Sequence, residues 1–148
     1  MATTRMSMPH SPDAVFAVLA DGQRYAEWVV GAKRIRGVDE GWPALGKRIH
    51  HTVGIGPLTI DDTTACLEVD PPVRIVLEAR AWPAGKARVT MTITPEPGGS
   101  EVVMDEVPTG GPAKTLFNPV LDGLTHLRNL ESLRRLKAAA GRQPAATS

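Results

Sequence analysis

The residues RIVLEARAWPAGKARVTMTITPEPGGSEVVMDEV, at positions 74–107, alternate between apolar and polar side chains. Two groups of turn-forming residues interrupt this alternation, Pro83-Ala84-Gly85 and the segment from Pro95 to Gly99. A period of two is typical of strands with one buried face, and turn residues between such runs indicate hairpins. Positions 74–107 therefore predict three consecutive antiparallel strands.

The same period extends back toward the N-terminus as far as Ala32, with turn-forming breaks at 39–41, 54–57 and 70–72. The whole pattern predicts six consecutive strands between Ala32 and Val107. A shorter alternating run from Thr3 to Met8 predicts one more strand, so the complete sheet is expected to contain seven.

The remaining segments carry helical patterns. Ser11-Pro12-Asp13 predicts a helix start, because serine caps helix N-termini, proline suits the first turn and aspartate favours the positive end. Asp21-Gly22 ends this helix, and residues 23–29 predict a second short one. A long amphipathic helix is predicted over about 113–140, and Gly141 and Pro144 end it. Its apolar positions are spaced three and four apart: Leu116, Val120, Leu124, Leu127, Leu130 and Leu133.

A length of 148 residues corresponds to one domain. The order of elements predicts a single α+β domain over residues 1–141 and a flexible tail over 142–148. The long helix must bury its apolar stripe, and one face of the sheet is the apolar surface available to it. Because a strongly twisted sheet curves away from the helix at one end, we expect a space between them.

Four motifs accompany this order of elements. They are Ala17-Val18-Leu19-Ala20-Asp21-Gly22-x-x-Tyr25-x-x-Trp28-Val29, Trp42-Pro43-x-x-Gly46, Ile49-His50-His51-x-x-Gly54-x-Gly56-Pro57 and Arg128-Asn129-x-Glu131-x-Leu133. With these motifs, residues 3–139 resemble the SRPBCC superfamily, also called START-like, Bet v 1-like or polyketide cyclase/dehydrase-like. The resemblance implies a helix-grip fold with a deep hydrophobic cavity. That superfamily includes lipid carriers, cyclases and hormone receptors, and because no activity-specific motif is matched in this sequence, no catalytic residue is carried over from it.

The positions of the turns predict which residues face each other across the sheet. The turn around residues 82–86 sets Ala81 opposite Ala87, Ala79 opposite Val89, and Leu77 opposite Met91. The loop at 94–101 sets Met91 opposite Met104 and Val89 opposite Glu106. All of these side chains share the inner face of the sheet. The inner layers thus change from bulky residues to alanines, which predicts a hollow end at Ala79, Ala81 and Ala87.

Glu106 is predicted to point into this hollow end. A lone inward carboxylate costs several kcal/mol unless it is paired or protonated. One interpretation is structural: Glu106 pairs with an arginine or caps backbone near Pro108. Another is that it anchors a ligand or acts as a general acid or base. A register slip that turns it outward is the third.

The hairpin at 54–57 provides a second candidate polar group. It sets Val53 opposite Leu58 and His51 opposite Ile60, which leaves His51 diagonal to Asp62 on the inner face. An imidazole oriented by a carboxylate is a suitable general base, and it is equally a satisfied polar pair in a wall. Beyond Asp62 the apolar phase changes, which predicts a β-bulge within 61–64.

Composition excludes several classes of function. Seventeen basic and sixteen acidic residues give a net charge of +1 without a concentrated basic face, which argues against nucleic-acid binding. Cys66 is the single cysteine and is expected to be a buried structural thiol rather than a nucleophile. Neither a metal site nor a cofactor is expected, because His50 and His51 point to opposite faces and no phosphate-binding loop is present. No apolar run is long enough to span a membrane, and a cytoplasmic location is expected.

These observations lead to one principal functional hypothesis, the binding of a hydrophobic or amphipathic small molecule between the sheet and the long helix. An alternative is a polyketide cyclase/dehydratase-type enzyme in which His51 and Asp62, or Glu106, transfer protons. A third is an interaction module, with a homodimer left open. The residues expected to contact the ligand are Tyr25, Trp28, His51, Leu77, Ala79, Met91, Met104, Glu106, Leu116, Val120, Gly123 and Leu124.

Overall fold

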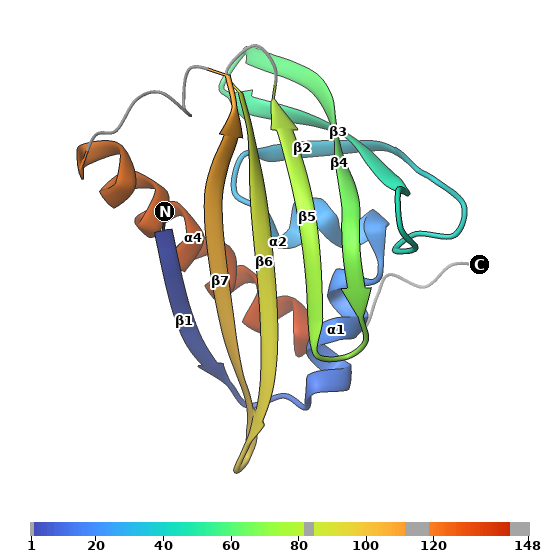
Figure 1. The fold of residues 1–148 in the computed structure, drawn as a ribbon, viewed down its shortest axis with the longest axis vertical. Helices are drawn as coiled ribbons and strands as arrows, with labels where there is room; N and C mark the ends of the chain where they lie inside the picture. Colours follow the sequence, from blue (N-terminus) through green and yellow to red (C-terminus); the bar gives the residue numbers. More distant parts are fainter. Residues whose placement is uncertain (1, 82–84, 112–118, 143–148) are drawn as a thin grey trace.

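The fold is that of a computed structural model, which describes residues 2–81, 85–111 and 119–142 (Figure 1). The predicted element order is confirmed. The elements are β1 (Ala2–Met8), α1 (Pro12–Leu19), the 3₁₀ turn η1 (Gly22–Arg24), α2 (Tyr25–Trp28), β2 (Ala32–Val38), β3 (Arg48–Ile55), β4 (Leu58–Asp70), β5 (Arg74–Ala81), β6 (Gly85–Glu96), β7 (Gly99–Gly110) and α4 (Pro119–Ala140). The predicted tail at 142–148 lies almost wholly outside the described residues.

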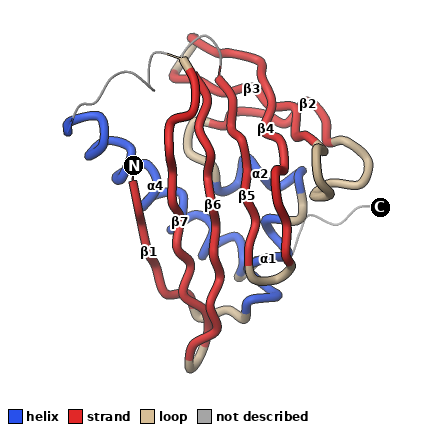
Figure 2. The backbone as a smooth tube through the Cα atoms, in the orientation of Figure 1, coloured by secondary structure: helices blue, strands red, loops and turns tan. Residues whose placement is uncertain are grey.

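All the strands form one antiparallel sheet of seven, in the order β1-β7-β6-β5-β4-β3-β2. The helices lie on one side of this curved sheet, and α4 runs across that side at an angle to the strands (Figures 1 and 2). The helix α4 contacts β1, α1 and α2. The predicted α+β helix-grip architecture is therefore confirmed.

Local sequence accounts for both ends of the helical layer. The side chain of Ser11 accepts a hydrogen bond from the backbone N–H of Ala14, at 3.2 Å, which confirms the predicted N-cap of α1. At the other end of the chain, α4 stops at Ala140, next to Gly141 as predicted. Leu116 and the expected first turns of the long helix lie outside the described residues.

The core fills the end of the domain where α1 and the last turns of α4 meet the sheet. Val15 and Val18 of α1 and Leu133 and Leu136 of α4 are almost completely buried. They pack in one cluster with bulky residues on the inner face of the sheet, including Ile75, Met91, Ile93 and Val102. The alanines of the inner face, Ala79, Ala81 and Ala87, lie at the opposite end of β5 and β6. They are not members of this core cluster of described residues.

The register between β6 and β7 is the predicted one, with Met91 opposite Met104 and Val89 opposite Glu106. The register between β5 and β6 is shifted by two residues from the prediction. Ala79 faces Ala87, and Leu77 faces Val89. The strands extend to the pair Ala81 and Gly85, so the loop between them is shorter than predicted. An even shift leaves every side chain on its predicted face, and it pairs Ala87 with Ala79 instead of Ala81.

The β3–β4 hairpin differs from the prediction in the same way. Ile55 pairs with Leu58, so the turn contains only Gly56 and Pro57. Gly56 has a φ of +58°, a conformation that favours glycine. As a result His51 lies directly opposite Asp62 rather than diagonal to it. The predicted bulge at 61–64 is also wrong, since the irregularity in β4 falls between Cys66 and Glu68.

The orientation of α4 differs from the predicted leucine stripe. Leu124 and Leu127 are 57% and 62% exposed, whereas Leu133 is completely buried. Leu133 lies nine positions after Leu124, and at about 100° per residue the two lie on opposite sides of the helix. The packing of Leu133 and Leu136 in the core therefore turns Leu124 toward solvent. The side of α4 that faces the sheet beyond the core carries Asn129 and Ser132 instead.

Candidate ligand cavity

A cavity of about 600 Å³ lies between the sheet, α4 and the short helix α2. Its apolar wall includes Leu77, Ala79, Ala87, Val89 and Met104 from β5, β6 and β7. The other lining residues come from α2 and its following loop, from β3, from the ends of β5–β7 and from α4: Tyr25, Trp28, Val29, Val30, Gly31, His51, Val53, Gly54, Arg80, Ala81, Gly85, Lys86, Glu106, Pro108, Thr125, Arg128, Asn129 and Ser132. The hollow part of the domain thus lies where the inner face of the sheet carries alanines.

The structure brings most of the predicted site residues to this cavity. Those that line it are Tyr25, Trp28, His51, Leu77, Ala79, Met104 and Glu106. Met91 is instead completely buried in the core cluster. Gly123 and Leu124 lie on the exposed part of α4 and do not line the cavity. The side chain of Val120 lies outside the described residues, as does Leu116.

The spacing of apolar residues did not predict the polar residues that α4 contributes to the cavity wall. Arg128, Asn129 and Ser132 line the cavity, although the leucine spacing suggested an apolar helix face. Arg128 and Asn129 did stand out as part of the C-terminal motif. Nothing in the motif itself indicated that its side chains face the interior.

Glu106 is paired with Arg128, which agrees with the structural interpretation of this carboxylate. Arg128 Nη2 lies 2.5 and 2.6 Å from the two carboxylate oxygens. The Glu106 side chain is 12% exposed and the Arg128 side chain 43%. The pair joins β7 to α4 at the cavity wall and leaves Glu106 with its charge compensated.

A chain of hydrogen bonds connects Tyr25, Thr64 and His51. The Tyr25 hydroxyl lies 2.8 Å from Thr64 Oγ1, and His51 Nε2 lies 2.9 Å from the same oxygen. The rings of Tyr25 and His51 are stacked, with centroids 5.5 Å apart and planes 5° apart. Burial raises the pKa of Tyr25 to about 12, so its hydroxyl stays protonated near neutral pH. This network holds α2 against the inner face of the sheet.

The predicted hydrogen bond between His51 and Asp62 is not formed. His51 Nε2 bonds to Thr64, and among the described residues His51 Nδ1 has no hydrogen-bond partner. The Asp62 carboxylate accepts the backbone N–H of Thr63 and pairs with Arg80, whose Nε lies 3.4 Å away. Burial lowers the pKa of His51, although the nearby charge of Asp62 acts in the opposite direction. The imidazole is therefore neutral at pH 7.

The lowered pKa of His51 predicts a specific dependence of stability on pH. Below the ordinary value of 6.5 the unfolded chain binds a proton at this position that the folded chain does not bind. Stability is thus complete above about pH 6.5 and declines as the pH falls below it. Urea unfolding at pH 7.5, 6.5 and 5.5 should show this decline in the wild type and a smaller decline in His51→Gln. An equal decline in the free energy of unfolding between pH 7.5 and 5.5 in the two proteins would contradict the assignment.

Two buried polar atoms of cavity-lining residues have no hydrogen-bond partner within the described part of the chain. They are His51 Nδ1 on the sheet and Asn129 Nδ2 on α4. The side chains of His51 and Asn129 are 1% and 0% exposed. A third such atom, Thr109 Oγ1, belongs to a residue that does not line the cavity. Each unmade bond of this kind costs about 1–3 kcal/mol, so these positions require an explanation.

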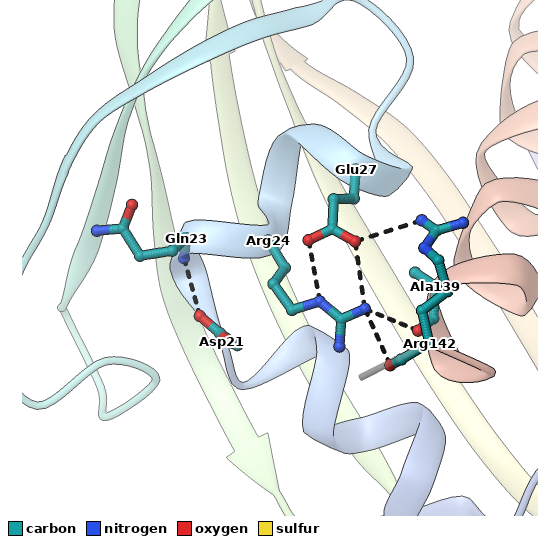
Figure 3. Close-up of polar contacts among 6 residues, drawn as sticks. All are labelled: Asp21, Gln23, Arg24, Glu27, Ala139 and Arg142. Carbon is teal, nitrogen blue, oxygen red and sulfur yellow. Dashed lines mark hydrogen bonds and ion pairs between the residues drawn. The ribbon is translucent and has the colours of Figure 1, made fainter. Parts of the chain in front are cut away.

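A cluster centred on Arg24 holds α2 against the end of α4 (Figure 3). Arg24 is buried, and it donates to both carboxylate oxygens of Glu27, at 3.0 and 3.2 Å, and to the carbonyl oxygen of Ala139 at 2.7 Å. Arg142 also donates to Glu27, at 3.3 Å. The hydrogen bond from Arg24 holds the pKa of Glu27 below its ordinary value. The cluster therefore fixes the helix that carries Tyr25 and Trp28 into the cavity wall.

Three further observations concern metal ligands, the single cysteine and membrane-spanning helices. Among the described residues, no group of three or more His, Cys, Asp and Glu side chains could hold a metal ion. Cys66 is buried, and burial raises the pKa of its thiol, as expected for a structural cysteine. Within the same residues, no helix combines the length and apolar character needed to cross a membrane.

A curved seven-stranded sheet around a C-terminal helix, with a cavity between them, is the architecture that the helix-grip resemblance implied. The chain belongs to the family described as polyketide cyclase / dehydrase and lipid transport, whose model matches residues 1–141. Comparison with curated proteins finds no match.

Solved structures share the fold at low sequence identity. A Chromobacterium violaceum protein is 20% identical with a TM-score of 0.69, over 97% of this chain and all of that one. The protein Ara h 8.0201 is 13% identical with a TM-score of 0.72, over 93% of this chain and 95% of that one. DynU16, from the dynemicin biosynthetic locus, is 17% identical with a TM-score of 0.65, over 93% of this chain and 45% of that one. At these identities the likeness establishes the fold alone.

Proposed function

We propose that the protein binds a hydrophobic or amphipathic small molecule, of the lipid, polyketide or isoprenoid type, in the cavity beneath α4. The cavity itself is the observation that carries this proposal. Its volume of about 600 Å³ falls within the range of roughly 300–1,000 Å³ that is usual for small-molecule sites. Its wall is largely apolar and contains a small number of polar groups, which is also usual for such sites.

The charges around the cavity support a ligand whose buried part is uncharged. Glu106 is compensated by Arg128, and Arg80 by Asp62. Lys86 Nζ lies 3.8 Å from Glu78 Oε2. Since each of these cations has a carboxylate beside it, transfer of a neutral apolar molecule into the cavity leaves no charge unpaired. The main favourable contribution to the binding free energy is then the burial of apolar surface, at about 25 cal/mol per Å².

Fluorescence titration with the neutral apolar dye N-phenyl-1-naphthylamine tests this function. We expect a saturable rise in emission at one dye per chain with a dissociation constant in the low micromolar range, about −8 kcal/mol. Decane added to the complex should displace the dye, because both molecules compete for the same apolar volume. A linear, non-saturating rise or a failure of decane to displace the dye would contradict the proposal.

Proton-transfer catalysis on the bound molecule is the second candidate, and one observation favours it. The neutral imidazole of His51 is linked through Thr64 to the protonated hydroxyl of Tyr25 at the cavity wall. A neutral imidazole accepts a proton and a phenol donates one, so this chain has the groups that a cyclisation or dehydration requires. Once a ligand is identified, Tyr25→Phe and His51→Gln should keep dye affinity while abolishing any turnover; unchanged turnover would exclude this candidate.

A further inference from the structure

We propose that Asn129 is a specificity-determining residue of the cavity, and that its Nδ2 donates a hydrogen bond to a neutral carbonyl or hydroxyl oxygen on the ligand. This inference rests on the proposed function, since it assigns the kind of ligand that the cavity accepts. Nδ2 of asparagine only donates hydrogen bonds, so its partner must be an acceptor.

The orientation of the Asn129 amide is set by its neighbour Arg128. Arg128 Nε and Nη2 lie 3.4 and 3.3 Å from Asn129 Oδ1, so the oxygen is the atom that faces the guanidinium. The amide nitrogen is left without a hydrogen-bond partner among the described residues, although the side chain is completely buried. Asn129 contributes to the cavity lining, between Thr125 and Ser132 on the same side of α4. A buried donor that no described residue satisfies points to a partner outside the chain, which at a cavity wall is a water molecule or a ligand atom.

Two groups of acceptors in the cavity wall near Asn129, on Glu106 and Ser132, take hydrogen bonds from other donors. Both carboxylate oxygens of Glu106 accept from Arg128. The hydroxyl oxygen of Ser132 accepts the backbone N–H of Val30 at 3.2 Å. Neither residue accepts from Asn129 Nδ2, which has no partner among the described residues. The missing acceptor is therefore expected to come from the bound molecule.

The same contacts indicate a neutral oxygen rather than a carboxylate. Arg128 is the nearest cation to Asn129, and Glu106 already occupies it at 2.5 and 2.6 Å. A ligand carboxylate at Asn129 would lie near a compensated ion pair and would lose its hydration without gaining a free positive charge. A ketone, aldehyde, ester or alcohol loses much less on transfer. We therefore assign an oxygenated, uncharged segment of the ligand to the α4 wall.

The test compares two probes that differ only in the acceptor, 2-acetylnaphthalene and 2-isopropenylnaphthalene, which carry C=O and C=CH₂ on the same skeleton. Affinities are measured by displacement of N-phenyl-1-naphthylamine from the wild type and from Asn129→Leu. We expect the substitution to weaken binding of the ketone relative to the alkene about tenfold, the value of one buried hydrogen bond. 2-Naphthoate at pH 7.5 should bind the wild type more weakly than the ketone does.

Two further variants make the test specific. Asn129→Asp keeps the shape of the side chain but has no N–H at this position, so it should also reduce the ketone-to-alkene ratio. Leu77→Val, on the apolar wall of the same cavity, should change both affinities by the same factor. If the ratio is the same in the wild type and both Asn129 variants, or if naphthoate binds more tightly than the ketone, this inference is overturned while dye binding still stands. If no probe and no dye binds the wild type, the proposed function fails and this inference fails with it.

Discussion

Replacing Arg24 with methionine is expected to lower the free energy of unfolding by about 3 kcal/mol. The guanidinium is buried and makes hydrogen bonds to Glu27 and to the carbonyl of Ala139, which is itself completely buried in the last turn of α4. Hydrogen bonds that involve a charged group contribute about 1.5–3 kcal/mol each, and an uncapped buried carbonyl adds its own cost. Methionine keeps the apolar length of the side chain, so the loss comes from the polar contacts.

A thermal melt measures this effect directly. For a domain of this size about 3 kcal/mol corresponds to a decrease of roughly 10 °C in Tm. The matched control is Arg142→Met, which removes only a half-exposed contact of 3.3 Å with the same Glu27 carboxylate. Exposed ion pairs contribute about 0–1 kcal/mol, so the control should melt within about 3 °C of the wild type. Similar decreases for both variants would show that Arg24 has no special role.

Replacing Ala79 with tryptophan is expected to abolish dye binding, with at least a hundredfold loss of affinity. Ala79 lies directly opposite Ala87, and both residues line the cavity from the inner face of the sheet. An indole ring attached there occupies the volume that the dye requires. Because the ring enters an existing space rather than a packed core, the loss of stability should stay within about 2 kcal/mol.

The control for this substitution lies one residue beyond Ala87 in the same hairpin. Arg88 is exposed, and its side chain alternates with those of Ala87 and Val89, so it points away from the cavity. Arg88→Trp adds the same aromatic group to the outer face and should leave the dissociation constant of the dye unchanged. Dye affinity that survives Ala79→Trp, in a variant whose circular dichroism spectrum is native, would mean that the dye binds elsewhere.

The element order and the faces of the strands were predictable from the sequence because both depend on periodicity. Alternation assigned Leu77, Ala79, Met104 and Glu106 to the inner face, and all four line the cavity. The β6–β7 register followed as well, because the centre of its turn was placed correctly, although the strands pair as far as Glu96 and Gly99 and the turn is shorter than the predicted loop at 94–101. In the other two hairpins the centre of the turn lies one residue from the predicted position, which shifts the register by two residues and leaves the alternation unchanged. Periodicity alone does not detect such a shift.

The polar side of α4 was not predictable in the same way. The rule that an amphipathic helix turns its leucines inward holds for Leu133 and Leu136, which meet the core. It fails for Leu124, which lies on the opposite side of the helix from the buried Leu133. The side of α4 that borders the cavity carries the polar residues Arg128, Asn129 and Ser132. The contribution of Arg128 and Asn129 therefore depends on tertiary structure, which a helical pattern does not contain.

The most direct test of ligand binding in this cavity is a crystal structure of the protein grown with N-phenyl-1-naphthylamine. The predicted result is electron density for one dye molecule per chain, in contact with Ala79 and Ala87 on the sheet and with Asn129 or Ser132 on α4. Density for the dye only at the outer surface, with the space between Ala79 and α4 closed by side chains, would contradict the proposal.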